Sequence, residues 1–366
     1  MTEEKIKLGI IFGGRSGEHD VSLMSARSIL SVLDNEKYEI FQIGISRQGK
    51  WLTGENVLDA FATNNIGNLL PAVLFPQPGS HTLFTVSVGE LIRITNLDVI
   101  FPVLHGTFGE DGTLQGFLEL ADIAYVGAGV LGSAVGMDKG LFKYVMQANN
   151  IPVLEFNILN RSDIQKDIQE AIKIAESTAP YPLFVKPANL GSSVGISKCK
   201  NRAELKSGLE KACRYDRRII VERGINAREI EISVLGNDHP QASIPGEILP
   251  KDSFYTYEDK YINGKAETII PEIDPELSRK LKELSIKAYK AVDCSGMARV
   301  DFLLDKETGA YYLGEINTIP GFTQISMYPK LWNASGLSYP ELIDQLINLA
   351  IERKMERDQT EREYSS

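Results

Sequence analysis

Residues 298–317 read ARVDFLLDKETGAYYLGEIN, two runs of alternating apolar and polar side chains separated by a short polar segment that contains a glycine. A period of two is typical of β-strands, whose successive side chains point to opposite faces. The runs therefore predict two antiparallel strands, Ala298–Leu304 and Tyr311–Asn317, joined by a turn at Asp305–Ala310.

The predicted strand pair carries charged and amide side chains in a pattern that suits a metal. Arg299 and Asp301 share one face of the first strand, and Glu315 and Asn317 share one face of the second. Two carboxylates and an amide are oxygen donors of the kind that Mg²⁺ prefers. A solvated hairpin face is the alternative, which the apolar neighbours of each acid disfavour. The acids converge only if Asp301 is opposite Glu315, so we predict that register, with an odd-length loop or a bulge at the turn.

The first third of the chain has a different texture. Up to about Gly127, strand and helix patterns alternate, which predicts an α/β domain with a parallel sheet covered by helices. Asp20 or Ser22 is the predicted cap of the first helix. Residues 54–85 are polar and weakly periodic, and we interpret them as an insertion with short elements. The predicted strands are 8–12, 39–45, 98–103 and 123–126, and the predicted helices are 20–33 and 114–120.

The rest of the chain divides near Glu222. The pattern up to that residue predicts a compact α+β unit of ordinary domain size. Beyond it we expect strands, a long loop at 246–265, a helix at 275–292, the strand pair and two closing helices. We therefore predict three domains, 1–127, 128–222 and 223–366. Within the second, the predicted helices are 139–149, 163–177 and 202–213, and the predicted strands are 153–159, 183–186, 194–197 and 219–222.

Composition excludes several classes of protein. The 366 residues are 43% hydrophobic and 24% charged, which is typical of a globular protein and not of a disordered chain. The net charge of −10 disfavours a nucleic-acid partner, because phosphate backbones bind clustered Lys and Arg. No run of 18 apolar residues occurs, so no membrane span and no membrane partner are expected. Three cysteines without a CxxC motif indicate a reduced, cytoplasmic setting.

One glycine motif supports a competing interpretation. Residues 127–132 read GAGVLG, a literal GxGxxG after a predicted strand, and Glu155 lies at a suitable distance for the ribose acid of a dinucleotide site. Rossmann domains usually open on this motif, whereas here it falls more than a hundred residues into the chain. A glycine turn between domains is therefore the favoured interpretation.

Three further segments predict ligand contacts, although each has a plainer alternative. The segment 186–195, KPANLGSSVG, combines a strand-ending lysine with a Gly/Ser loop that can wrap a polyphosphate, or it is only a hairpin connection. Gly321 lets a backbone N–H approach a ligand, and Ser326 begins a helix whose N-terminus favours an anion. Within the long loop at 246–265, residues 254–261 carry three tyrosines and a lysine, which suggests a lid.

A pair of loops predicts a substrate site at one edge of the first sheet. Glu18 and His19 follow the first strand and its glycine loop, while His105 and Gly106 follow the strand at 98–103. Ligands bind at the carboxyl ends of strands in open α/β sheets, so these loops point to one edge. A carboxylate there suits a substrate ammonium.

Taken together, the motifs resemble those of one family. They are GGRSGEHDVS, HGTFGEDGTLQG, GMDK, VKPANLGSSVG, YEDKY, ARVDFLL and GEINTIPGFTQISMYP, in this order from residue 13 to residue 329. This set resembles the D-alanine–D-alanine ligases of the ATP-grasp superfamily over nearly the whole chain. The resemblance implies a three-domain ATP-grasp fold with an N-terminal parallel-sheet preATP-grasp domain. It also implies ATP-dependent joining of two D-alanines through a D-alanyl phosphate, for peptidoglycan precursors.

The resemblance also implies the residues that hold ATP and the metals. The acids Glu222 and Glu229 would meet the adenine and ribose, with backbone contacts to the base at 221–224. Two Mg²⁺ ions, which Mn²⁺ could replace, would bind Asp301, Glu315 and Asn317. The implied phosphate ligands are Lys139, Lys186, the loop 191–193 with Ser193, and Lys260 of the lid.

Both amino-acid substrates have implied contacts as well. Glu18 would bind the ammonium of the first D-alanine, with Val21 and His105 nearby. The second D-alanine would place its carboxylate against Ser326 and Met327. Arg299 and the Gly321 N–H would stabilise the tetrahedral oxyanion. A triad of Glu18, Ser192 and Tyr261 would hold the lid over the site.

Three alternatives stay open at this point. A ligase of the same family could join D-alanine to D-lactate or D-serine, although Tyr261 and YEDKY match the D-Ala-D-Ala type. The others are a degenerate ATP-grasp protein that only binds, and a biotin-dependent carboxylase, which residues around Glu18 and Tyr261 do not support. The resemblance further implies a homodimer, with D-alanine and ATP as the small-molecule partners.

Overall fold

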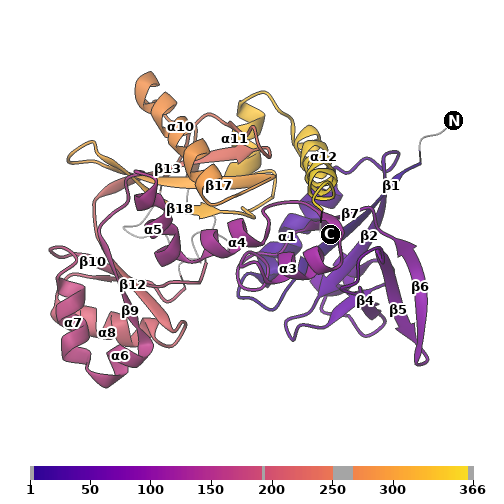
Figure 1. The fold of residues 1–366 in the computed structure, drawn as a ribbon, viewed down its shortest axis with the longest axis horizontal. Coiled ribbons are helices and arrows are strands. Elements are labelled where there is room, and N and C mark those ends of the chain that lie inside the picture. The colour runs from indigo at the N-terminus through magenta and orange to yellow at the C-terminus, as the bar shows by residue number, and fades with distance from the viewer. Residues whose placement is uncertain (1–3, 192–193, 250–266, 362–366) are drawn as a thin grey trace.

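The computed structural model describes residues 4–191, 194–249 and 267–361. These residues form three sheets that follow one another along the chain, each with its own helices. In Figure 1 the first sheet lies on the right, the second at the lower left and the third above and between them. Among the described helices, none is long and apolar enough to cross a bilayer.

The first sheet is parallel only at one side. Its order is β6-β5-β4-β3-β2-β1-β7-β8, in which β1 pairs in parallel with β2 and β7, and β7 with β8. The four strands predicted to form a parallel sheet are therefore correct. The antiparallel strands come from residues 51–96, most of which the sequence predicted to be an insertion with short elements. The strands are β1 (Ile6–Gly13), β2 (Tyr38–Ile45), β3 (Trp51–Thr53), β4 (Leu70–Val73), β5 (Thr82–Ser87), β6 (Glu90–Asn96), β7 (Val99–Pro102) and β8 (Ala124–Tyr125).

The helices of this part are α1 (His19–Leu30), α2 (Val57–Ala62) and α3 (Thr113–Leu120). Neither Asp20 nor Ser22 caps α1, because Glu18 occupies the N-cap position. Ser22 Oγ instead accepts from Gly13 N at 2.7 Å and donates to Val103 O. The serine therefore joins the ends of β1 and β7 instead of capping the helix.

The second sheet is antiparallel, in the order β11-β10-β12-β9. The predicted helix 163–177 is two helices, because Asp167 breaks it and its side chain accepts from Gln169 N and Glu170 N, both at 3.0 Å. The elements are β9 (Phe156–Asn160), α6 (Arg161–Lys166), α7 (Ile168–Glu176), β10 (Leu183–Pro187), β11 (Ser197–Cys199), α8 (Arg202–Ala212) and β12 (Arg218–Arg223).

The third sheet has the order β16-β15-β13-β17-β18, with β14 paired to β13. Part of the predicted loop 246–265 belongs to this sheet, since its first four residues form β15. The elements are β13 (Ala227–Leu235), β14 (Gln241–Ala242), β15 (Gly246–Leu249), β16 (Glu267–Ile269), α10 (Pro275–Ala291), β17 (Met297–Asp305), β18 (Tyr311–Asn317), α11 (Met327–Ala334) and α12 (Tyr339–Arg357).

Two helices connect the first sheet to the others. They are α4 (Val130–Met137), which the sequence analysis did not predict, and α5 (Lys139–Ala148). Phe142 and Met146 of α5 lie in the same apolar core as Ile230 of β13. The GxGxxG segment is the turn into α4, and a side chain on Gly132 would come within 2.9 Å of Asp293 O. Its last glycine therefore serves close packing within the protein.

The strand pair β17–β18 has the predicted register. Asp301 is opposite Glu315 and Arg299 is opposite Asn317, so the four side chains can share a face. The bulge lies at Gly314 and not at the predicted turn, because Phe302 is opposite Leu313. A Cβ on Gly314 would lie 3.2 Å from Asp301 O, so the extra residue fits best as glycine.

The last helix returns to the first sheet. Leu342 and Leu346 of α12 share an apolar core with Phe101 of β7, and Figure 1 shows α12 lying beside that sheet. Arg353 of α12 donates to Gly127 O, to Ser295 Oγ at 2.6 Å and to Tyr125 O at 3.0 Å. Its guanidinium also stacks 4.2 Å from the Tyr125 ring centroid. One side chain thus binds segments of the first and third sheets together.

Arg353→Lys should destabilise the protein by about 1–3 kcal/mol, because an ammonium cannot keep the forked hydrogen bonds and the stacking. Urea unfolding measures the change. Arg279→Lys, in an exposed pair with Glu276 and Glu283, is the matched control and should have little effect. Equal effects of the two substitutions would contradict the role given to Arg353.

Candidate active site

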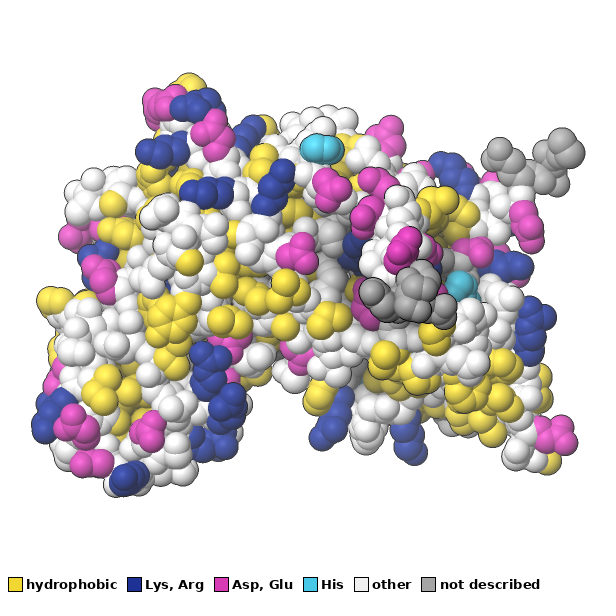
Figure 2. Space-filling model, in the orientation of Figure 1, with side chains coloured by type: hydrophobic (Ala, Val, Ile, Leu, Met, Phe, Trp, Pro, Cys, Tyr) yellow, Lys and Arg dark blue, Asp and Glu magenta, His cyan; other side chains and the backbone are white. Residues whose placement is uncertain are grey.

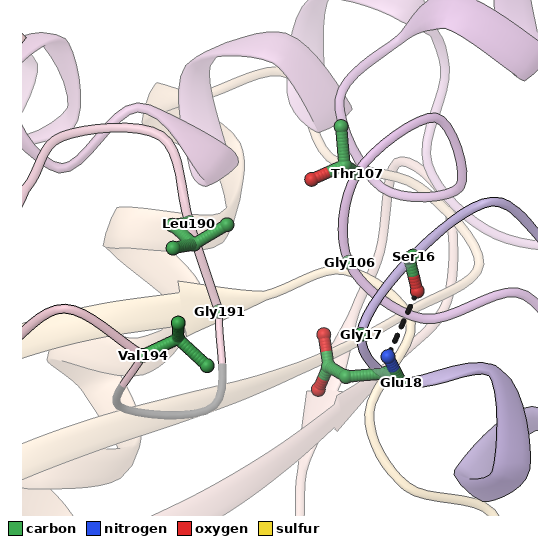
Figure 3. Close-up of a pocket in the computed structure, with 8 residues that line it drawn as sticks. All are labelled: Ser16, Gly17, Glu18, Gly106, Thr107, Leu190, Gly191 and Val194. Carbon is green, nitrogen blue, oxygen red and sulfur yellow. Dashed lines mark hydrogen bonds between the residues drawn. The ribbon is translucent and has the colours of Figure 1, made fainter. Parts of the chain in front are cut away.

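A small pocket lies where three loops meet. Figure 3 shows residues 16–18 and 106–107 on one side of it, and Leu190, Gly191 and Val194 on the other. The first two loops follow β1 and β7, and the third follows β10. The carboxyl ends of the parallel strands therefore face the glycine loop of the second sheet, as the sequence analysis predicted for the first two loops.

Glu18 projects into this pocket toward Gly191 (Figure 3). A Cβ on Gly106 would lie 2.4 Å from Glu18 Oε2, and one on Gly191 would lie 3.0 Å from the same atom. Gly106 also has φ +74, which glycine adopts without strain. The Glu18 N–H donates to Ser16 Oγ at 3.0 Å, and Ser16 Oγ donates to His105 O at 2.8 Å. The carboxylate is thus held between two glycines by a braced loop.

His105 is buried and joins the first sheet to the loop after β18. Its Nδ1 lies 3.0 Å from Ile319 O, and its Nε2 lies 3.0 Å from Ser25 Oγ. Burial lowers the pKa of the imidazole, although the charge of Glu18 opposes this. The neutral ring then donates from Nδ1 to the carbonyl and accepts at Nε2 from the serine.

Glu110 is a site residue that the sequence analysis quoted within a motif but gave no role. Its carboxyl accepts from Gly106 N at 2.6 Å and from Ile319 N at 3.2 Å, so it links the same two loops as His105. Loss of solvation and then the charge of Glu18 raise the pKa of Glu110 to about 8, against the charge of Arg299. Its place after β7, at the edge that carries His105, was the signal available in the sequence.

Hydrogen bonds hold the loop after β18 in place just beyond Gly321. The Phe322 N–H donates to Ser25 Oγ at 3.3 Å, and Phe322 O accepts from Tyr339 Oη at 2.6 Å. Ser326 is the residue before α11, and its Oγ accepts from Thr323 N at 3.1 Å. A Cβ on Gly321 would lie 3.2 Å from Ser326 Oγ, so the two predicted ligand residues are neighbours.

Charged and amide side chains contact one another on the face that β17 and β18 share. Arg299 donates to both carboxylate oxygens of Asp301, at 2.8 and 2.6 Å, and lies 3.1 Å from Glu231 Oε2. Asn317 Nδ2 donates to Asp301 Oδ2 at 2.9 Å. Although burial opposes its charge, Asp301 and then Glu231 hold the pKa of the Arg299 guanidinium well above its usual value.

The oxygen donors on this face fit a magnesium ion that also binds ligands from outside the protein. Asp301, Glu315 and Asn317 share one face through the register of β17 and β18. Within the described residues, no cluster of three or more His, Cys, Asp or Glu side chains could hold a metal alone. Mg²⁺ commonly binds one or two carboxylates and completes its shell with water and substrate phosphates, which matches this set.

The two described lysines that we predicted to bind phosphates each lie near a carboxylate of the site. Lys139 Nζ is 3.6 Å from Glu315 Oε2 and donates to Leu190 O at 2.9 Å, while Lys186 pairs with Glu222. Figure 2 shows Lys and Arg side chains gathered on the flank of the second sheet's unit that borders the notch beside the first sheet. Each of the two predicted phosphate lysines is therefore already near an acid of the site.

The structure brings most of the predicted residues together. Glu229 of β13 is opposite Leu303 of β17. Although burial opposes its charge, Glu222 and then Glu315 and Glu229 raise the pKa of Lys186. Val21 and Met327 are both buried, the first in α1 and the second at the start of α11. Four predicted residues lie outside the described part of the chain: Ser192, Ser193, Lys260 and Tyr261.

Known proteins are similar to this chain in both sequence and fold. Residues 7–128 match the family model described as D-ala D-ala ligase N-terminus, and residues 145–348 match D-ala D-ala ligase C-terminus. A D-alanine--D-alanine ligase from Natranaerobius thermophilus is 47% identical over 365 residues, 99% of each chain. One from Thermoanaerobacter sp. is 50% identical over 357 residues, which cover 97% of this chain and 99% of that protein.

Solved structures agree with these matches. The D-alanine-D-alanine ligase from Coxiella burnetii superposes with a TM-score of 0.84 at 39% identity, covering 97% of both chains. The VanG D-Ala:D-Ser ligase from Enterococcus faecalis has a TM-score of 0.85 at 36% identity, covering 95% of this chain and 100% of that one.

The carboxyl of Glu110 should make stability depend on pH. Its pKa of about 8 lies above the ordinary 4.5, so its contribution is full below pH 4.5 and is lost as pH rises through 8. The free energy of unfolding of the native protein, measured relative to that of Glu110→Gln, should fall by about 1–3 kcal/mol over this pH range. This is less than the full pKa shift implies, because the site is partly open to water. Urea unfolding at several pH values measures it, and a constant difference would contradict the assignment.

Proposed function

The chain belongs to the D-alanine–D-alanine ligase family, and we propose how its own residues share the work of that reaction. It is an ATP-dependent ligase with the ATP-grasp fold, and it joins two D-alanines into D-Ala-D-Ala for peptidoglycan precursors. The observation that carries the assignment of roles is the position of Glu110. This carboxyl accepts from Gly106 N at 2.6 Å and from Ile319 N at 3.2 Å, so it joins the pocket at the first sheet to the loop that leaves β18.

The first D-alanine binds between the loops of the first sheet and the glycine loop. Glu18 receives its ammonium, because the carboxylate points into the pocket and is fixed between Gly106 and Gly191. His105 and Val21 complete this end of the site. The neutral imidazole adds no positive charge that would repel the ammonium.

ATP lies between the second and third sheets, with its phosphates toward Lys139 and Lys186 and its base and ribose toward Glu222 and Glu229. The N–H groups of Arg223 and Gly224 already donate to Glu155 O and Pro182 O, so other backbone groups of this strand end meet the base. Asp301, Glu315 and Asn317 hold the divalent metal, which when bound neutralises phosphate charge and orients the γ-phosphoryl group. The use of two ions, and the choice between Mg²⁺ and Mn²⁺, are parts of this proposal.

The reaction has two steps. A carboxylate oxygen of the first D-alanine attacks the γ-phosphorus of ATP, forming D-alanyl phosphate and releasing ADP. The amine of the second D-alanine then attacks the carbonyl carbon, and phosphate leaves. Arg299 and the Gly321 N–H stabilise the oxyanion between these events, and removing one such donor typically costs about 10²–10³ in rate.

The second D-alanine is held by its carboxylate at Ser326 and Met327. Ser326 is at the N-terminus of α11, where the helix dipole favours an anion, and its hydroxyl lies beside Gly321. Phe322 is fixed by Ser25 and Tyr339, so the neighbouring glycine N–H is preorganised.

The lid assignment rests on the sequence alone. In it, Glu18, Ser192 and Tyr261 form the triad that fixes the lid, and Ser193 and Lys260 reach the phosphates. Closure would shield the acyl phosphate from water. The homodimer and the cytoplasmic location stay predictions of the same kind.

Incubation with D-alanine, ATP and Mg²⁺ should give D-Ala-D-Ala, ADP and phosphate, resolved by mass spectrometry of the products. Adding D-lactate or D-serine tests the alternative acceptors, which the curated relatives do not favour. A chain that forms the depsipeptide or the D-Ala-D-Ser product but no D-Ala-D-Ala would overturn the assignment.

Glu315→Ala should abolish D-alanine-dependent ADP release while leaving the fold intact, because the side chain is about one-third exposed and its pair with Lys139 is long. A steady-state assay over a Mg²⁺ titration reads the effect. Glu307→Ala, in the exposed turn between the same strands, is the control and should retain activity. Normal turnover of Glu315→Ala at low Mg²⁺ would contradict the metal assignment.

A further inference from the structure

A buried lysine beneath the nucleotide end of the site has no role in the reaction described above. Lys143 lies on α5, one turn after Lys139, and its side chain is only 2% exposed. Its Nζ is 2.8 Å from Glu222 Oε1 and 5.6 Å from the Phe156 ring centroid. A buried ammonium is costly unless it is paired, so Lys143 needs the carboxylate that it contacts.

Glu222 is shared between two lysines from different elements. Lys143 of α5 contacts Oε1, and Lys186 of β10 contacts Oε2. Burial would raise the pKa of this carboxyl, but the two ammoniums outweigh it and lower the pKa to about 2. Glu222 is therefore ionised, with one cation on each oxygen.

The two lysines differ in what else they can reach. The Lys186 side chain is 22% exposed and ends the strand that leads into the glycine loop, where the nucleotide phosphates are proposed to bind. The Lys143 side chain faces the core and stays with Glu222. If Lys186 turns toward a phosphate, Lys143 alone prevents Glu222 from becoming an unpaired buried charge.

We propose that Lys143 is a positioning residue for the nucleotide, which neutralises Glu222 and holds it in place while Lys186 moves to the phosphates. Oε2 of Glu222, released by Lys186, is then the acceptor for the exocyclic amine of the adenine. This inference rests on the ATP site proposed above and adds a residue that touches neither substrate nor metal.

Lys143→Met should raise the KM for ATP by about 10-fold, while kcat should change less than about 3-fold. A 10-fold change is the usual size of a coupling between groups in one hydrogen-bonded network. The reason is that Lys186 stays with Glu222 when the second ammonium is absent. ADP binding by calorimetry without D-alanine should weaken by the same factor. Lys173→Met is the matched control, since this lysine pairs with Glu170 on an exposed helix face and should leave both values unchanged.

A double-mutant cycle separates this role from a structural one. In a Glu222→Gln background the carboxylate is gone, so adding Lys143→Met should change the KM for ATP by less than about 3-fold. This comparison holds even if Lys143→Met alone folds poorly, because replacing both members of a buried pair is better tolerated than breaking it. Circular dichroism and thermal unfolding check that each variant is folded.

Two results would overturn the proposal: a further 10-fold rise in KM on adding Lys143→Met to Glu222→Gln, or a fall in kcat with an unchanged KM. D-alanine-dependent ADP release by the native protein is measured in the same series. Its absence would overturn the proposed function, whereas normal release with an unaffected Lys143→Met variant would overturn only the role of Lys143.

Discussion

The site depends on the register of β17 and β18, which places Asp301 opposite Glu315. Because side chains alternate along a strand, a slip of one residue would turn one of these acids into the apolar core. The bulge at Gly314 absorbs the extra residue between the paired acids and the turn. With that register fixed, Arg299 and Asn317 bind Asp301, and the loop after β18 leaves toward Glu110 and His105.

The second organising feature is the pairing of two site acids with cations from other segments. Glu315 of β18 lies near Lys139 of α5, and Glu222 of β12 lies between Lys143 and Lys186. These pairs stabilise charge that would otherwise be costly to bury. They also place cations where nucleotide phosphates would compete for them. The net charge of −10 therefore gives no indication of how charges are paired within the site.

Much of the fold was predictable because local pattern and tertiary structure agree. The buried strand at the N-terminus, the strand pair and the long helix beginning at Pro275 all follow from periodicity. The errors have identifiable causes. Asp167 caps a new helix within an apparently continuous pattern. The edge strand β6 exposes Leu91, Ile92 and Ile94, so its apolar residues do not mark one buried face. The helix α4 was missed because its glycines resemble a turn.

The candidate site was predictable where one motif carries several ligand groups, as at Asp301, Glu315 and Asn317. Glu110 and Lys143 received no role because their significance depends on distant partners. Glu110 meets Ile319 more than two hundred residues away. Lys143 of α5 meets Glu222 of β12, with the other elements of the second sheet's unit between them in the chain. Neither contact has a spacing that a sequence pattern can express.

The sequence by itself therefore determined the family, the chemistry and the register of the central strand pair, because those depend on residue types at short, fixed spacings. Only the tertiary structure decided which cation neutralises which acid, where the bulge lies and which loops meet around Glu18. These outcomes depend on close approach between segments that are far apart in the chain. That approach is set by the packing of three sheets and by the return of α12 to the first of them.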